Sequence, residues 1–238
     1  MSAEKLLREL REQANPRKAR ELQRFFKTGA GEYAHGDIFL GITVPTTRSI
    51  ARNYLDLPIS QLRKLTHSPF HEVRFCALVI LINKYQRAKD RHEEERYFDF
   101  YMAELRKGKI NNWDLVDVSA PTLGRFLLTA KGSRTFLREM AKDANMWVRR
   151  TSILFTFASM RIGDIRPTLD ISTKLLSDEH DLIHKAVGWA LREVGKINPA
   201  ELRAYLASHG KRMSRTTLRY AIEKFTPQER KMWLEQTR

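Results

Sequence analysis

The sequence contains one cysteine, few glycines and prolines, and no long apolar run. A single cysteine, Cys76, excludes a disulfide framework and any zinc site built on cysteines. Eleven glycines and eight prolines among 238 residues leave room for long regular helices. No stretch reaches the ~20 consecutive apolar residues of a membrane span, and the first residues lack the apolar core of a signal peptide. We therefore expect a folded cytoplasmic protein without membrane contacts.

Acidic residues are also few. The chain has 43 Lys and Arg against 28 Asp and Glu, which gives a formal net charge of +15. Because 42% of the residues are apolar and 10% aromatic, the composition is not that of a disordered basic tail. A folded protein with this charge favours a polyanionic partner.

Apolar residues recur at helical spacing through most of the chain. The pattern is clearest over residues 73–85, 148–157, 183–194 and 218–225. Strict alternation of apolar and polar residues is almost absent, so the sequence predicts an all-α fold. Capping side chains precede a proline at the expected helix starts Asn15-Pro16, Asn198-Pro199 and Thr226-Pro227.

One region, residues 27–45, does not follow the helical pattern. Its sequence, KTGAGEYAHGDIFLGITVP, holds four of the eleven glycines and follows an apolar helix end. We interpret it as an ordered loop whose apolar run, residues 38–42, inserts into the core. No change in composition divides the chain, so we expect one domain over residues 1–238.

Three segments align without gaps: VRFCALVILI from Val73, VRRTSILFTF from Val148 and IHKAVGWALR from Ile183. A fourth segment, LRYAIEKF, begins at Leu218, so successive segments are offset by 75, 35 and 35 residues. The offset of 75 residues leaves room for a further repeat near residues 110–118. A period of about 35–40 residues filled by two helices is typical of HEAT or armadillo hairpins. The sequence therefore predicts a superhelical stack of HEAT-like hairpins, an α-solenoid, with a concave basic cleft. The alternative is chance similarity among amphipathic helices.

Basic residues occupy equivalent positions in the aligned segments. Arg74, Arg149, His184 and Arg219 follow the leading apolar residue, and Lys185 stands one position further on. If the hairpins stack in register, these side chains form a stripe along one surface. DNA has one negative charge per ~1.7 Å of axis, so we predict DNA contacts by Arg74, Arg149, Lys185 and Arg219. A solvated basic face is the alternative.

The segment KINNWDLVDVSAPTLG, residues 109–124, places an aspartate in an unusual position. Trp113 and Asp117 are four residues apart and so share one face of a helix. Asp114 falls in the first turn, where acids often serve the backbone, and we interpret it as structural. Asp117 lies in mid-helix in a protein rich in cations, so it is either the partner of an arginine or a reactive carboxylate.

The repeat spacing predicts that Asp117 shares a surface with residues further along the chain. Arg150 lies 33 residues after Asp117, Lys185 lies 35 residues after Arg150, and Trp189 follows Lys185 by one turn. The face of an indole ring binds cations with ~0.5–2 kcal/mol, so a cleft with two tryptophans and a carboxylate would favour a nucleotide with a cationic base. Taken singly, each tryptophan is more often a core residue than a ligand contact; the combination is what favours a cleft.

Four segments are similar to one known family: NNWDLVD at residues 111–117, APTLGRFLL at 120–128, MWVRRTSILF at 146–155 and KAVGWALRE at 185–193. The chain resembles the AlkD family of DNA alkylation repair glycosylases, which is built from HEAT-like repeats. The WDxVD element with a downstream W-x-x-R and GW is the specific part of the resemblance. Residues 25–42 resemble a loop that many members of this family have.

The resemblance implies hydrolysis of the N-glycosidic bond of 3-methyladenine, 7-methylguanine and related alkylpurines in duplex DNA, as a step of base excision repair. The family's catalytic aspartate falls on Asp117, its two cleft tryptophans on Trp113 and Trp189, and its active-site arginine on Arg150. An aromatic residue that flanks the cleft corresponds to Phe25, which lacks a hydroxyl group.

This chemistry needs no cofactor, and we expect no metal. The seven histidines lack ligand spacing beyond isolated pairs such as His67 and His71, which we interpret as surface residues. We expect a nucleoid-associated, bacterial monomer that binds double-stranded DNA with alkylated bases. Two other functions stay open: a non-catalytic HEAT-repeat protein that binds damaged or branched DNA, and a protein-binding scaffold.

Overall fold

The computed structural model describes residues 1–237, and every regular element in this range is a helix apart from one isolated bridge between Ile38 and Phe70. The all-α prediction is confirmed. No helix in the described range is both long and apolar enough to cross a membrane. The chain divides into two compact units, Met1–Ser119 and Ala120–Arg238, with the boundary inside helix α7 (Trp113–Leu123). The expectation of a single domain stays a prediction.

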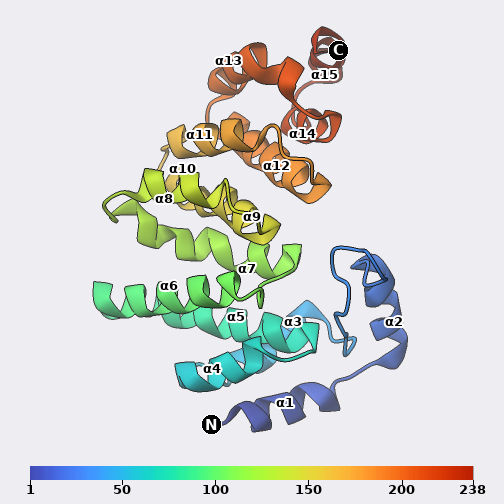
Figure 1. Cartoon of the computed structure of the whole chain (residues 1–238), viewed down its shortest axis with the longest axis vertical. Helices are drawn as coiled ribbons and strands as arrows, with labels where there is room; N and C mark the ends of the chain where they lie inside the picture. Colours follow the sequence, from blue (N-terminus) through green and yellow to red (C-terminus); the bar gives the residue numbers. More distant parts are fainter. Residues whose placement is uncertain (238) are drawn as a thin grey trace. The chain divides into compact units, whose positions relative to one another are not determined.

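Unit 1 is organised around one long apolar helix (Figure 1). Its helices are α1 (Ala3–Glu12), α2 (Pro16–Phe25), α3 (Val44–Arg52), α4 (Ile59–Thr66), α5 (His71–Gln86), α6 (Arg91–Arg106) and the first turns of α7. Helices α3, α4 and α6 all pack on α5, and residues 71–82 of α5 are buried without interruption. Residues 75–82 of α5 are all apolar, and a segment that is apolar on all sides must be enclosed by its neighbours, so this part of α5 forms the core of the unit.

Unit 2 contains stacked helical hairpins (Figure 1). Its elements are the 3-10 helix η1 (Gly124–Leu128), α8 (Ser133–Met140), α9 (Met146–Phe155), α10 (Phe157–Arg161), α11 (Arg166–Leu175), α12 (Asp181–Ile197), α13 (Pro199–His209), the 3-10 helix η2 (Gly210–Arg212), α14 (Arg215–Ala221) and α15 (Pro227–Gln236). Helix α8 packs on α9 and α11 on α12, while α9 and α14 each pack on α12. The aligned segments at residues 148, 183 and 218 therefore lie in helices that pack in succession.

The three predicted helix caps are present. The side chains of Asn15, Asn198 and Thr226 accept hydrogen bonds from backbone N–H groups three residues later, at 3.0, 3.2 and 3.2 Å. In each case the next residue is a proline in the first turn. Because the first N–H groups of a helix have no partner within it, these side chains fix the starts of α2, α13 and α15.

The loop between α2 and α3 inserts into the core, as predicted. Phe39, Leu40 and Ile42 are buried, although Ile38 at the start of the apolar run is 43% exposed. The carboxylate of Glu72 on α5 accepts three backbone N–H bonds, from the residues at 40, 41 and 42, at 2.9, 2.8 and 3.2 Å. These bonds fix the loop to the start of the central helix.

Candidate functional site

Helix α7 places Trp113 and Asp117 one turn apart near its start, as predicted. Both side chains are half-buried. The preceding residue, Asn112, is buried and caps the helix: its carbonyl accepts from Val116 N at 3.2 Å, and its Oδ1 accepts from Trp113 N at 2.8 Å. The start of the helix with the two candidate side chains is therefore fixed by its own cap.

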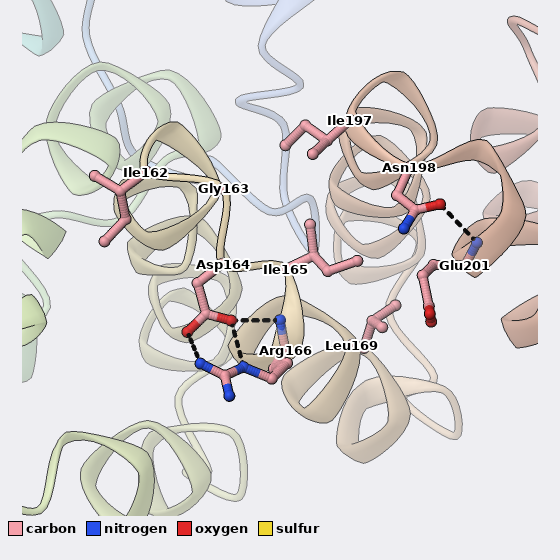
Figure 2. Close-up of a pocket in the computed structure, with 9 residues that line it drawn as sticks. All are labelled: Ile162, Gly163, Asp164, Ile165, Arg166, Leu169, Ile197, Asn198 and Glu201. Atoms are coloured by element: carbon pink, nitrogen blue, oxygen red, sulfur yellow. Dashed lines mark hydrogen bonds and ion pairs between the residues drawn. The ribbon is translucent and has the colours of Figure 1, made fainter.

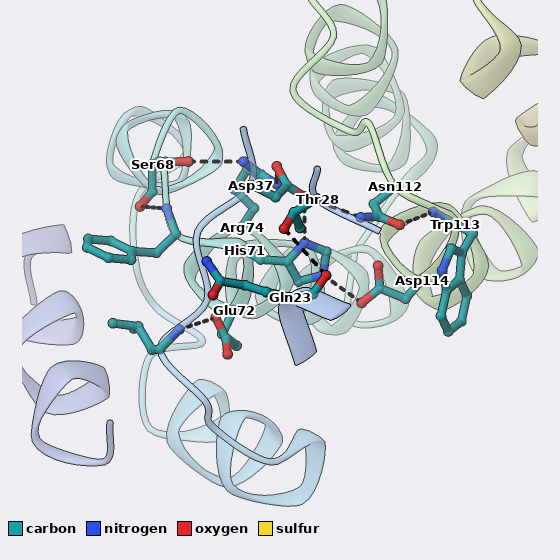
Figure 3. A network of polar contacts seen from close by, with 12 residues as sticks. Gln23, Thr28, Asp37, Ser68, His71, Glu72, Arg74, Asn112, Trp113 and Asp114 are labelled. Atoms are coloured by element: carbon teal, nitrogen blue, oxygen red, sulfur yellow. Dashed lines mark hydrogen bonds and ion pairs between the residues drawn. The ribbon is translucent and has the colours of Figure 1, made fainter. Parts of the chain in front are cut away.

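A buried network of charged side chains surrounds this helix start (Figure 3). The ring of His71, at the first position of α5, lies between two carboxylates: Nδ1 is 3.1 Å from Asp37 and Nε2 is 2.8 Å from Asp114. Asp37 also accepts from Arg74 Nη2 at 2.6 Å and from Asn112 Nδ2 at 3.3 Å. Two carboxylates therefore face one imidazole and one guanidinium, and their charges balance when the imidazole is protonated.

The protonation states follow from these contacts. Burial lowers the pKa of His71, but the charge of Asp114 and the hydrogen bonds to Asp114 and Asp37 outweigh this effect and raise the pKa to about 9. Burial raises the pKa of Asp37, but the hydrogen bond from His71 and the charge of Arg74 outweigh this effect and lower the pKa below that of an ordinary aspartate. His71 is thus an imidazolium that donates from both ring nitrogens at neutral pH.

The interpretation of His71 as a surface residue is wrong. Its side chain is 3% exposed, because it serves as the cation between the buried carboxylate of Asp37 and the partly buried carboxylate of Asp114. His67 does have an exposed edge, and its Nε2 lies 2.9 Å from the buried carboxylate of Glu104. Asp114 lies in the first turn of α7, as predicted, but its carboxylate pairs with the His71 ring and not with the helix backbone.

Aromatic rings connect the same network to Trp113. The Trp113 ring stacks on Phe26 with centroids 5.2 Å apart, Phe26 stacks on Phe39 at 4.9 Å, and Phe39 stacks on His71 at 4.6 Å. Phe25 meets Trp113 edge-on at 6.1 Å and is 64% exposed. The loop and α2 thus fix the orientation of the indole and place an exposed aromatic ring beside it.

In unit 2, helices α9, α10 and α12 position the other predicted residues. Arg150 is buried, and its Nη1 donates to the carbonyl of Leu182 in the first turn of α12. Trp189, two turns further along α12, is half-buried and meets Phe157 edge-on at 4.8 Å. Arg150 therefore contacts the helix that contains Trp189.

The predicted charge stripe does not include Arg74. Its side chain is 8% exposed and its guanidinium is bound to Asp37, so the prediction of a DNA contact there is wrong. The cause is the loop, which places a carboxylate over this helix position. Arg149 is also engaged: its Nε lies 2.6 Å from Asp178, and its Nη1 donates to two backbone carbonyls.

The other two stripe residues are more accessible. Lys185 is half-exposed and pairs with Asp181 one turn earlier at 2.7 Å, and Arg219 is exposed. DNA contacts by Arg149, Lys185 and Arg219 stay predictions. The sequence also predicts that Trp113 and Asp117 of unit 1 share one cleft with Arg150, Lys185 and Trp189 of unit 2. This convergence stays a prediction as well.

A shallow pocket of about 520 Å³ lies in unit 2 (Figure 2). It is lined by Ile162, Gly163, Asp164, Ile165, Arg166, Leu169, Ile197, Asn198 and Glu201. One of its two carboxylates, Asp164, binds Arg166 at 2.8 Å, and Asn198 caps α13, so Asp164, Arg166 and Asn198 already have partners. None of the predicted site residues lines this pocket. Within residues 1–237 no three His, Cys, Asp or Glu side chains are grouped as metal ligands.

Sequence reasoning missed the network that fixes the start of α7. His71 lies 34 residues from Asp37 and 43 from Asp114, so no local spacing relates the three. The one signal in the sequence was the glycine-rich loop at residues 27–45. Its composition predicted that the loop packs against the core, but not which side chains it contacts there.

Comparisons with known proteins give a family from one source and a fold from another. A family model described as DNA alkylation repair enzyme matches residues 6–225. A solved structure, "Predicted DNA alkylation repair enzyme from Enterococcus faecalis", is similar with a TM-score of 0.70 and 18% sequence identity, over 90% of this chain and 98% of that chain. At this identity the likeness shows the fold. No match was found among proteins with a curated description.

Proposed function

This chain belongs to the family of DNA alkylation repair enzymes, and we propose that it is a DNA glycosylase that excises cationic N3- and N7-alkylated purines from duplex DNA. The observation that supports this function best is the pair Trp113 and Asp117, one turn apart on a helix whose start is fixed by a buried network. The net charge of +15 supports a DNA partner.

The proposed reaction is hydrolysis of the bond between C1′ and N9. Alkylation at N3 or N7 makes the purine cationic, so it leaves as a neutral base with the bonding electron pair and needs no strong general acid. The sugar then has oxocarbenium character at C1′, which the carboxylate of Asp117 stabilises by its charge. Water adds to C1′ and gives its proton to this carboxylate, which leaves an abasic site.

The other residues bind the substrate in this proposal. Trp113, held by Phe26 on one side, offers a rigid apolar surface to the deoxyribose, and Trp189 provides a second one. Arg150 would contact a phosphate once its buried guanidinium turns from the carbonyl of Leu182, and the exposed ring of Phe25 flanks the lesion. The protein acts as a cytoplasmic monomer on alkylated duplex DNA.

The test uses duplex DNA methylated at purine nitrogens, with chromatography of the released bases. Asp117→Asn should keep the affinity for DNA and lose 7-methylguanine release by about 100-fold or more, because it removes the charge opposite the oxocarbenium ion. Asp99→Asn is the matched control, since Asp99 is an exposed aspartate on α6. Release by Asp117→Asn at the wild-type rate would overturn the role of Asp117. Tight, salt-sensitive binding by the wild type with no base released would indicate a non-catalytic protein that binds damaged DNA.

A further inference from the structure

Two consecutive residues at the start of α5 hold the α2–α3 loop (Figure 3). The carboxylate of Glu72 binds the loop backbone at residues 40–42, and His71 N donates to the carbonyl of Ile38 at 2.8 Å. The ring of His71 reaches the loop through Asp37 and α7 through Asp114. The loop, α5 and α7 are thus joined at one buried side chain.

We propose that Asp37, His71 and Asp114 form a clamp that positions Trp113 and Asp117 for base excision, with His71 as the positioning residue. The inference rests on the proposed function and adds to it residues that do not touch DNA. His71 is 2% exposed, so it acts only through the side chains around it.

The clamp reaches Trp113 by two separate routes. The first is the hydrogen bond from His71 Nε2 to Asp114, the residue directly after Trp113. The second is the stack of rings in which Phe39 packs on His71 and Phe26 packs between Phe39 and Trp113. A change at His71 therefore alters both the backbone position and the ring support of the indole.

The charges around His71 make the clamp depend on its proton. The charged groups that face the ring are Asp37 from the loop, Asp114 from α7 and Arg74 from α5 itself. Without the imidazolium, the buried carboxylate of Asp37 and the partly buried carboxylate of Asp114 share a single cation, and one of them loses its donor. Repulsion and desolvation then displace the first turn of α7, and Asp117 moves with it because it lies three residues after Asp114.

The first measurement is single-turnover release of 7-methylguanine with protein in excess, for His71→Gln, Asp114→Asn and the control His92→Gln. His92 is exposed on α6. While folded protein still exceeds and saturates the DNA, a variant that merely folds less well keeps the wild-type rate constant, whereas a misplaced carboxylate lowers it. We expect the rate constants of the two clamp variants to fall about tenfold or more, since small displacements of reacting groups have large effects. Affinity for unmodified duplex DNA should stay unchanged.

The second measurement does not depend on activity. The chain has four tryptophans, and Trp113 is the one in unit 1, so ¹⁹F NMR of 5-fluorotryptophan protein gives a signal for it that Trp113→Phe assigns. We expect this signal to shift in His71→Gln and Asp114→Asn but not in His92→Gln. In the wild type it should titrate near pH 9, and this titration should be absent from His71→Gln.

Two outcomes would overturn the clamp. One is a Trp113 signal that keeps its position in a folded clamp variant. The other is a shifted signal with a wild-type rate constant, which would show that the contacts do not position the reaction. Asp114→Asn keeps an acceptor oxygen opposite His71 Nε2, so it provides the test if His71→Gln does not fold. A wild type that releases no base would refute the proposed function, and the ¹⁹F signal would then decide on the clamp by itself.

Discussion

The raised pKa of His71 makes the stability of the protein depend on pH. The pKa is about 9 in the folded protein and 6.5 for an ordinary histidine. Because the folded state binds this proton more tightly, the stabilisation is complete below pH 6.5 and is lost as the pH rises through 9. A shift of about 2.5 units at about 1.4 kcal/mol per unit corresponds to about 3 kcal/mol of unfolding free energy.

The assay is urea unfolding of the wild type and of His71→Gln at intervals from pH 6 to pH 10. The difference between their unfolding free energies isolates the titration of His71 from that of the other groups. This difference should fall by about 1.4 kcal/mol per pH unit between about pH 6.5 and 9 and be level outside that interval. A difference that stays constant from pH 6 to pH 10 would refute the assignment of His71 as a buried imidazolium.

Three further predictions concern other parts of the chain. In Gly188→Ala the added Cβ would lie 2.5 Å from Cβ of Tyr220, so α12 and α14 must separate. We expect the free energy of unfolding, measured by thermal unfolding, to fall by about 2 kcal/mol or more. An unchanged melting temperature would contradict this packing. Glu72→Ala leaves three loop N–H groups without their acceptor, so amides 40–42 should exchange hydrogen faster, and unchanged protection would show another acceptor. Arg219→Ala should weaken DNA binding and reduce the salt slope by about one unit, and an unchanged slope would remove Arg219 from the interface.

The parts of the fold that depend on local sequence were predictable. Helical periodicity gave the all-α fold, and Asn15, Asn198 and Thr226 marked helix starts because a cap and its N–H donor are three residues apart. The aligned segments predicted the successive packing of α9, α12 and α14, since each helical repeat presents the same apolar face to the next repeat. The spacing of Trp113 and Asp117 likewise predicted a shared helix face.

The pairing of charges was not predictable in this way. Arg74 and Arg149 hold the same repeat position, yet Arg74 is buried against Asp37, which comes from an irregular loop. Arg149 binds Asp178, which lies 29 residues away. A repeat position predicts the helix on which a cation lies, whereas its partner depends on tertiary contacts between distant residues. His71 was misjudged for the same reason.

In the proposed reaction the carboxylate of Asp117 promotes the removal of alkylated purines from DNA. Chromatography of free bases after incubation with N-methylated duplex DNA measures this removal directly. The wild type should liberate 7-methylguanine and leave abasic sites, and Asp117→Asn should bind the same DNA but liberate almost none. A wild type that binds the methylated duplex while every purine stays attached would refute the proposed glycosylase.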